Sequence, residues 1–308
     1  MLLAMVFAGI LLRAQQAPLP AQARLQSGLD LLNQRRYAEA EEAFRDAYRL
    51  DPSDLRGLMG QVEVKVAENQ FDGAFQLLQD EVDKNPGRSE LRLELGKLAS
   101  RAGRLDQAAS QFQTLVKETN RNYAAANNLY FLLGDLYDRL GNYDSAATNL
   151  RRALELRPRD AGLANRLAMV LQKGGKKEDA IRQYREVLKL DPDNGLATNN
   201  LADLLSESDS DLNEALILAR RARELLPGVP ETEDTLGWIY CRLKRFGEAV
   251  PLLDAVVHKA PGDPAFRFHL GTALQGTSDK AGALVQFMKA LECNPPQDLE
   301  RKIRAAIE

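Results

Sequence analysis

Few side chains in this sequence could carry out covalent or metal chemistry. Its 308 residues include only two histidines and two cysteines. Neither His258 nor His269 is followed by a second metal ligand four residues later, and Cys241 and Cys293 lack the spacing of a zinc motif. No glycine-rich phosphate loop and no G-x-S-x-G turn occurs. The sequence therefore predicts a protein that is not an enzyme and holds no metal or cofactor, with structural histidines and two separate buried thiols.

One acidic segment resembles the start of a calcium loop. Residues 206–211 alternate serine with glutamate or aspartate. A calcium loop of this type also needs a glycine and a closing glutamate, and neither follows at the required spacing. We therefore expect a polar turn in which Asp211 caps the helix that follows.

A repeat of about 34 residues sets the positions of all these side chains. Prolines recur 34 or 35 residues apart at Pro52 and Pro86, and then at Pro158, Pro192, Pro227, Pro261 and Pro295. A proline cannot continue a helix, because its ring clashes with the preceding turn and its nitrogen carries no hydrogen. Each proline therefore marks the end of a helix, and the fixed period indicates a stacked array of helical units.

Small and large residues repeat in the same register. Twelve residues before each of those prolines stands an alanine, and Ala108 fills that place in the one unit without the proline. Most of these alanines are preceded, twelve residues earlier, by a small residue and followed, four residues later, by a bulky one. Small residues let two helices approach closely, and a bulky residue fills the groove between them. The second unit departs from the pattern at Val62 and Glu81.

This register closely resembles the tetratricopeptide repeat (TPR). The last unit keeps the pattern best, with Leu270-Gly271, Leu274, Ala283, Phe287, Ala290 and Pro295. The resemblance covers about Ala21 to Gln297. It implies an all-α fold, a right-handed α-solenoid of about eight helix-turn-helix repeats closed by a C-terminal capping helix.

The repeat divides the chain into segments. Residues 21–122 hold units one to three, 123–126 are an insertion, 127–297 hold units four to eight, and 298–308 are the capping helix, with Leu299, Ile303 and Ile307 on one face. The stretch 119–128 carries four extra residues, about one helical turn. It is interpreted as a lengthened helix start or, alternatively, as a hinge between two subarrays.

The first residues suggest export from the cytoplasm. Residues 1–12 form an uncharged apolar run, too short to span a bilayer, and a polar segment with small residues follows up to residue 20. We expect a signal peptide, and hence a periplasmic or secreted bacterial protein without a membrane span. The alternative is an apolar helix that caps the first unit of a cytoplasmic protein. A net charge of −3 argues against a nucleic-acid partner.

The resemblance implies that the first helix of each unit lines a concave groove that holds a peptide or an extended protein segment. Residues shortly before and after the small residue of each first helix face that groove. They are polar or aromatic in units five to seven, and we predict the binding site at Asn165, Asn199, Asn200, Asp203, Asp234 and Trp238, with His269 nearby in unit eight. Asparagine suits an extended peptide, because it both donates and accepts hydrogen bonds. The alternative for Trp238 is packing against the neighbouring first helix.

Chaperone-type members of the family clamp a C-terminal carboxylate. Arg166 and Asn200 match parts of that clamp, but Phe131 and Leu196 stand where its lysines belong. The resemblance therefore favours a non-enzymatic protein-binding scaffold, similar in style to extracytoplasmic members of exopolysaccharide-export and cell-envelope systems. Two alternatives remain, a cytoplasmic adaptor or co-chaperone and a regulatory subunit of an enzyme complex. The sequence leaves homo-oligomerisation open.

Overall fold

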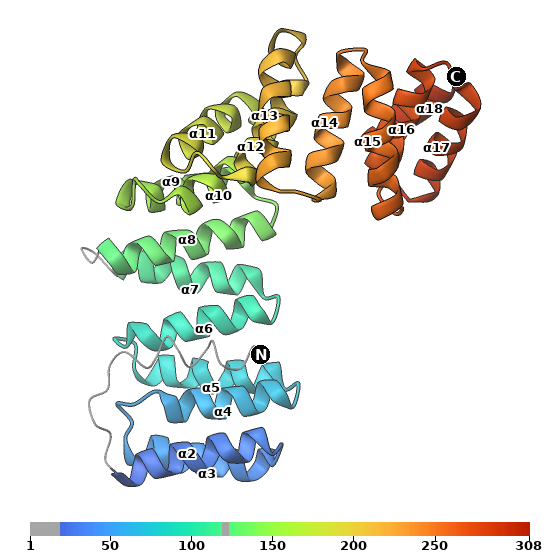
Figure 1. Cartoon of the computed structure of the whole chain (residues 1–308). Coiled ribbons are helices and arrows are strands. Elements are labelled where there is room, and N and C mark those ends of the chain that lie inside the picture. Colours follow the sequence, from blue (N-terminus) through green and yellow to red (C-terminus); the bar gives the residue numbers. More distant parts are fainter. Residues whose placement is uncertain (1–18, 119–122) are drawn as a thin grey trace. The chain divides into compact units, whose positions relative to one another are not determined.

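The computed structural model describes residues 19–118 and 123–308, and within these ranges the chain is entirely helical. The seventeen α-helices of this described part form eight antiparallel pairs and a final single helix (Figure 1). The predicted α-solenoid of eight repeats is therefore confirmed. The expected signal peptide lies almost wholly outside the described residues.

The helices fall into two compact units, which divide between Asn122 and Tyr123. The first unit holds three pairs: α2 (Leu19–Asn33) and α3 (Tyr37–Leu50), α4 (Arg56–Ala67) and α5 (Phe71–Lys84), and α6 (Ser89–Arg101) and α7 (Leu105–Glu118).

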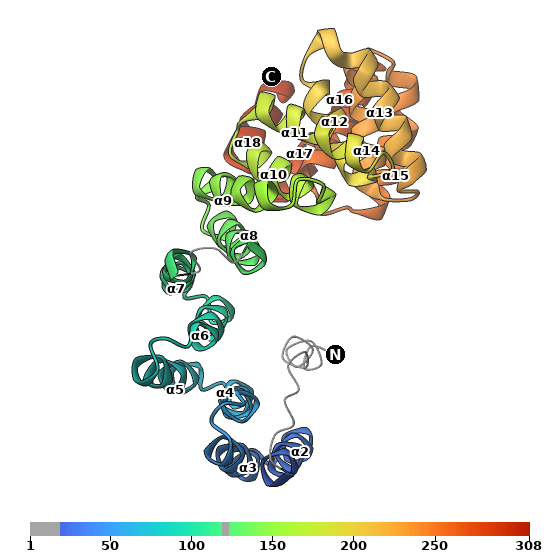
Figure 2. The ribbon, with the colours of Figure 1, turned by 90° about the vertical axis from the view of Figure 1, so that its left-hand side faces the viewer.

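The second unit holds five pairs and the closing helix: α8 (Tyr123–Arg139) and α9 (Tyr143–Leu156), α10 (Ala161–Lys173) and α11 (Lys177–Leu190), α12 (Gly195–Ser206) and α13 (Leu212–Leu225), α14 (Pro230–Arg242) and α15 (Phe246–Lys259), α16 (Pro264–Gly276) and α17 (Lys280–Glu292), and α18 (Gln297–Ile307). Within each unit the pairs stack one on the next (Figures 1 and 2). The part of the insertion that is described, from Tyr123 on, belongs to α8, which has 17 residues where α10 has 13.

The predicted register of small and large residues is the register of the packing. The eight repeat alanines, from Ala40 to Ala283, are at most 2% exposed. A Cβ atom placed on Gly237 would lie 2.7 Å from Leu253, and one on Gly28 would lie 2.7 Å from Phe44. Such distances are too short for any side chain, so the bulky residue of the second helix packs directly on the backbone of the first.

The second repeat, which departs from the pattern, is held by other contacts. Glu81 stands where an alanine recurs elsewhere, and its carboxylate accepts a hydrogen bond of 2.9 Å from the Tyr48 hydroxyl of α3. Gly60 brings α4 against the Phe44 ring, and Val62 is only 3% exposed. Burial, and to a smaller extent the Glu81 carboxylate, raises the pKa of Tyr48 to about 12. The Tyr48–Glu81 hydrogen bond and the close approach at Gly60 thus replace the contacts that small residues at positions 62 and 81 would make.

Three of the loops between repeats end in the same helix cap, and in a fourth Asp54 makes a similar bond although Leu55 holds the cap position of α4. Two residues after a repeat proline stands an aspartate or asparagine whose side chain accepts a hydrogen bond from a backbone N–H at the start of the next helix: Asp54 from Arg56, Asp160 from Leu163, Asn194 from Ala197, and Asp263 from Ala265 and Phe266. These bonds satisfy N–H groups that have no partner inside the helix. The loops therefore fix where each first helix begins.

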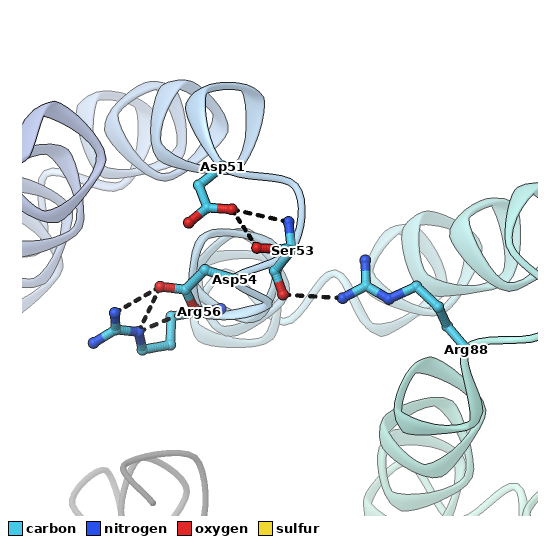
Figure 3. Close-up of polar contacts among 5 residues, drawn as sticks. All are labelled: Asp51, Ser53, Asp54, Arg56 and Arg88. Atoms are coloured by element: carbon cyan, nitrogen blue, oxygen red, sulfur yellow. Dashed lines mark hydrogen bonds and ion pairs between the residues drawn. The ribbon is translucent and has the colours of Figure 1, made fainter. Parts of the chain in front are cut away.

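One such loop is also tied to its neighbour (Figure 3). Asp51 accepts a hydrogen bond of 3.1 Å from the Ser53 N–H, and Asp54 binds Arg56 at 2.6 Å. Arg88, which follows the next repeat proline, donates to the carbonyls of Pro52 at 2.8 Å and Ser53 at 3.1 Å. Successive loops on this side of the first unit are therefore linked through a single guanidinium.

Two local expectations are wrong, and a third is confirmed. Asp211 ends a 3-10 turn, Asp209–Asp211, and its side chain makes no cap hydrogen bond with α13. Cys241 is a buried free thiol as expected, but Cys293 is only half-buried. The closing helix α18 covers the last repeat, as expected, through Leu299 and the fully buried Ile303, and Ile307 is 37% exposed.

Candidate functional site

The first helices of the second unit form its inner face. In the described residues α12 contacts α14 and α14 contacts α16, in addition to the contacts that each makes with its own second helix. Each second helix, in contrast, packs mainly between the first helix of its own repeat and that of the next. Helices that approach more closely on one side of a stack make that side concave. The first helices α12, α14 and α16 therefore lie on the side of this unit where the sequence predicts the groove, and α10 is the first helix of the repeat before them.

Four groove side chains from three successive first helices come together. His269 of α16 lies with its Nδ1 2.9 Å from both carboxylate oxygens of Asp234 on α14. The His269 ring stacks on Trp238 of α14, with ring centroids 4.3 Å apart and an interplanar angle of 21°. Asp203 of α12 lies within electrostatic reach of both Asp234 and His269. The structure thus unites three of the predicted site residues with the histidine of the next repeat.

Trp238 packs as a structural residue, which is the alternative to a free groove position. It packs against the neighbouring first helix, through His269 and through Phe268 at 6.1 Å between centroids. The ring is nevertheless only half-buried, so part of it faces the groove. The aromatic contact fixes the ring orientation, which lowers the entropy that a ligand would lose on binding there.

The Asp203 carboxylate is poorly solvated because its surroundings bury most of it. Burial raises its pKa above the ordinary range, the nearby charges of Glu207 and Asp234 raise it further, and His269 and Lys177 act in the opposite direction. No donor among the described residues makes a hydrogen bond with its side chain. Among the described residues its charge is therefore compensated only in part, by His269 and Lys177, and without a direct hydrogen bond.

Two of the predicted asparagines have buried oxygens without partners. Asn165 on α10 and Asn199 on α12 occupy equivalent positions, three residues before the small residue of their helices. The side-chain oxygen of each is buried and has no hydrogen-bond partner among the residues that the structure describes. Asn199 is only 8% exposed. A buried acceptor that stays unpaired costs free energy in the unliganded protein, about 1–3 kcal/mol in typical cases. Such atoms point to a ligand that would satisfy them.

Asn200 does not point freely into the groove. Its amide donates a hydrogen bond of 3.1 Å to the hydroxyl of Tyr184 on α11, and that hydroxyl donates at 2.8 Å to Gln172 of α10. Burial raises the pKa of Tyr184 to about 12, so the phenol keeps its proton. The Asn200 side chain thus joins the helix-packing network of two repeats, which gives it a structural role.

The structure also argues against a carboxylate clamp. Arg166, the arginine that matches part of that clamp, is already paired with carboxylates of the chain. Arg166 binds Asp135 at 2.5 Å and Asp138 at 3.0 Å, and Lys173 binds Asp138 at 2.9 Å. These pairs bridge α8 and α10. An arginine held by two carboxylates is poorly placed to bind the carboxylate of a ligand.

The sequence did not single out Phe268 or the link from His269 to Asp234. Phe268 could have been found from the repeat spacing, because it stands 34 residues after Asp234 at the equivalent position, whereas the contact of His269 with Asp234 depends on how two repeats stack. Within the described residues no group of histidines, cysteines and acids could hold a metal ion. Burial, with a smaller effect of Asp234, raises the pKa of the Cys241 thiol to about 12. The arrangement suits the binding of a ligand better than covalent chemistry.

None of the helices in the two described ranges is long and apolar enough to cross a membrane.

Comparison with known proteins identifies the repeat. Models of the tetratricopeptide repeat match residues 9–54, 25–89, 65–130, 128–160, 165–230 and 235–298. A TPR repeat-containing protein of Pseudomonas aeruginosa is 27% identical over 209 residues, which are 67% of this chain. Those residues are 35% of the relative, so the chain spans about a third of that protein.

A solved structure with a TM-score above 0.5 shares the fold, and a second one is similar over part of the chain. The Cut9 and Hcn1 hetero-tetramer of the APC/C is 16% identical, with a TM-score of 0.56 over 92% of this chain and 55% of that one. A thermophilic TPR protein of Thermus thermophilus is 23% identical, with a TM-score of 0.49 over 59% of this chain and 98% of that one. The repeat models together cover most of the sequence, and the helix pairs stack as such repeats require. This chain belongs to the tetratricopeptide repeat family.

Proposed function

We propose that the second unit is a non-enzymatic scaffold that binds an extended segment of a partner protein along the groove of α10, α12, α14 and α16. Tetratricopeptide repeats in general serve protein interaction, and the proposal assigns that role to one face of this chain. The observation that carries it is the pair of buried, unpaired side-chain oxygens of Asn165 and Asn199 at equivalent positions of successive repeats.

The chemistry of these two residues fits a peptide backbone. An extended peptide presents N–H donors at regular intervals, and side-chain amides can accept from them. Because the two asparagines recur with the repeat, they suit a ligand that runs across the first helices. Trp238 supplies a partly exposed aromatic surface on α14, a later first helix of the same run, and such a surface is a typical anchor for a partner side chain.

A selection from a random peptide library displayed on phage tests the proposal. The library is panned on the wild-type protein and, in parallel, on the double variant Asn165→Ala, Asn199→Ala. We expect peptides that are enriched on the wild-type protein and not on the variant. The matched control is Arg182→Ala, Ile217→Ala, which alters exposed residues on the second helices of the same two repeats. Equal enrichment on all three proteins would place the binding surface elsewhere.

We also propose that the protein acts outside the cytoplasm, in cell-envelope or exopolysaccharide assembly. Support for this comes from the apolar run of residues 1–12 and its polar flank, which lie outside the described residues. Intact-mass measurement of the native protein checks the export step. A mature chain that starts near Gln15 or Arg24 supports it, and a retained Met1 on a cytosolic protein contradicts it.

A further inference from the structure

Three side chains on α12 and α14 offer hydrogen-bond acceptors that are unpaired or only partly paired among the described residues. The side-chain oxygen of Asn199 is buried and unpaired. The Asp203 carboxylate receives no hydrogen bond from the described part of the chain. Asp234 is 7% exposed and, among the described residues, is bonded at its side chain by His269 alone. Since two carboxylates can accept several hydrogen bonds each, most of this acceptor capacity is unused.

These acceptors lie on α12 and α14, two first helices that contact each other. Asn199 lies one helical turn before Asp203, so both are on the same face of α12. Asp234 holds the position on α14 that Asn199 holds on α12, and its charge acts on Asp203. The face of α12 that carries Asn199 and Asp203 is therefore turned toward α14, where the Trp238–His269 stack forms an aromatic wall.

The charges around the Asp203 carboxylate do not balance. Asp203 is faced by Asp234, Glu207, Lys177 and His269. The ammonium of Lys177 is already bonded to Glu207 at 2.8 Å, and His269 is bonded to Asp234. The Asp203 carboxylate is left without a cation of its own. A buried carboxylate without a partner is costly, and a ligand that brings both positive charge and N–H donors removes that cost.

We propose that Asn199, Asp203 and Asp234 form a subsite for the cationic end of a basic side chain, an ammonium or guanidinium group, with the Trp238–His269 stack beside its aliphatic stem. This inference rests on the proposed groove and names the kind of residue that the partner places there. An ammonium group carries three donors and no acceptor, and a guanidinium carries five donors. Either one supplies what the three side chains lack.

The test uses the side-chain analogues themselves. The chain has a single tryptophan, so one indole N–H resonance in the proton NMR spectrum reports on Trp238. The full chain is titrated at constant pH with n-butylammonium and n-propylguanidinium, which mimic lysine and arginine, and with the neutral isostere 1-butanol. We expect a saturable shift with one or both cations and none with butanol, and the comparison of the two cations tells lysine from arginine.

Variants decide the assignment. Asp203→Asn should weaken binding of the cation about tenfold, because a charge-assisted contact is lost. The control Asp298→Asn removes an exposed carboxylate of α18 and should leave the affinity unchanged. Circular dichroism melts of each variant verify the fold. An equal shift with butanol, an unchanged affinity in Asp203→Asn, or the absence of a saturable shift with either cation would overturn the subsite.

The outcome is separable from that of the groove itself. If library peptides bind the groove without enrichment of lysine or arginine and the cations do not bind, the subsite fails and the proposed function stands. If the cations bind at Asp203 but no peptide is selected, the subsite stands as a small-cation site and the peptide groove fails.

Discussion

At the scale of residues, aspartate and asparagine have two distinct roles in this chain. In the loops they cap helices, as Asp160 does for α10. On the first helices they lie in the groove with acceptors that the chain leaves unpaired, as at Asn199 and Asp203. The two roles have opposite effects on stability, because a cap satisfies a backbone donor whereas an unpaired buried acceptor costs free energy.

Replacement of the Asp160 cap should destabilise the second unit. Asp160→Ala removes the 3.0 Å hydrogen bond to the Leu163 N–H and should lower the free energy of unfolding by about 1 kcal/mol. The matched control is Asp160→Asn, which keeps a cap of similar strength and should remain close to wild type. Urea denaturation followed by circular dichroism measures both. Equal stability of the alanine variant and the wild type would refute the cap.

The Asp203 carboxylate should make stability depend on pH. Its pKa in the folded protein is raised by burial, so the folded state binds more protons than the unfolded state between the two pKa values. Stability from this group is therefore lost as the pH rises through that window. Asp203→Asn should melt at a higher temperature than wild type at pH 7, and the difference should shrink as the pH falls toward the unfolded pKa. A variant that melts lower at pH 7 contradicts this assignment.

At the scale of helices, the register of the repeat could be predicted because it depends on local spacing. The alanines and their bulky partners lie at fixed intervals, and helical periodicity alone puts them in the contact between helices. The partners of the site residues could not be predicted in the same way. Periodicity gives the direction in which Asn200 leaves its helix but not that Tyr184 of the preceding repeat presents a hydroxyl there.

The same limit explains Trp238 and Asp211. Trp238 stands at the groove-facing position that its spacing predicts, yet its ring lies against His269, 31 residues later, which depends on how two repeats stack. Asp211 has the right type and place for a cap, but the 3-10 turn before α13 gives it a backbone conformation near φ −105° and ψ 0°. A capping residue normally has an extended backbone, so its carboxylate cannot reach the helix N–H groups.

Overpacking the repeat alanine provides a test of the helix register. Ala249 is fully buried where α15 meets its neighbours, and Ala249→Leu should cost about 1–3 kcal/mol, because extra methyl groups must push packed helices apart. Ala255→Leu on the exposed side of the same helix is the control and should be nearly neutral. Differential scanning calorimetry of the two variants makes the comparison. An unchanged melting temperature for Ala249→Leu would mean that the register is wrong.

At the scale of the whole molecule, the chain consists of two units rather than one uniform array. The division falls beside the place where the sequence lacks a repeat proline and carries four extra residues. In a linear array each repeat is stabilised by its neighbours, so cooperativity weakens where the register between repeats is interrupted.

The two units should open with different free energies. We expect native-state hydrogen exchange to give one set of opening free energies for residues 19–118 and another for residues 123–308. Deletion of the extra residues 123–126 serves as a comparison, because it should bring the two sets closer together. One common value across both ranges of the wild-type chain would show that the array opens as a single block.

The central claim is that the groove of the second unit binds an extended partner segment through Asn165 and Asn199. The most direct test is the dissociation constant of the tightest library peptide, measured from Trp238 fluorescence, for the wild type, the groove double variant Asn165→Ala, Asn199→Ala, and the outer-face double variant Arg182→Ala, Ile217→Ala. Loss of two hydrogen bonds to the ligand should raise the constant about tenfold or more in the groove variant, whereas the outer-face variant should match wild type. Equal constants for the groove variant and wild type, or a loss confined to the outer-face variant, would contradict the claim.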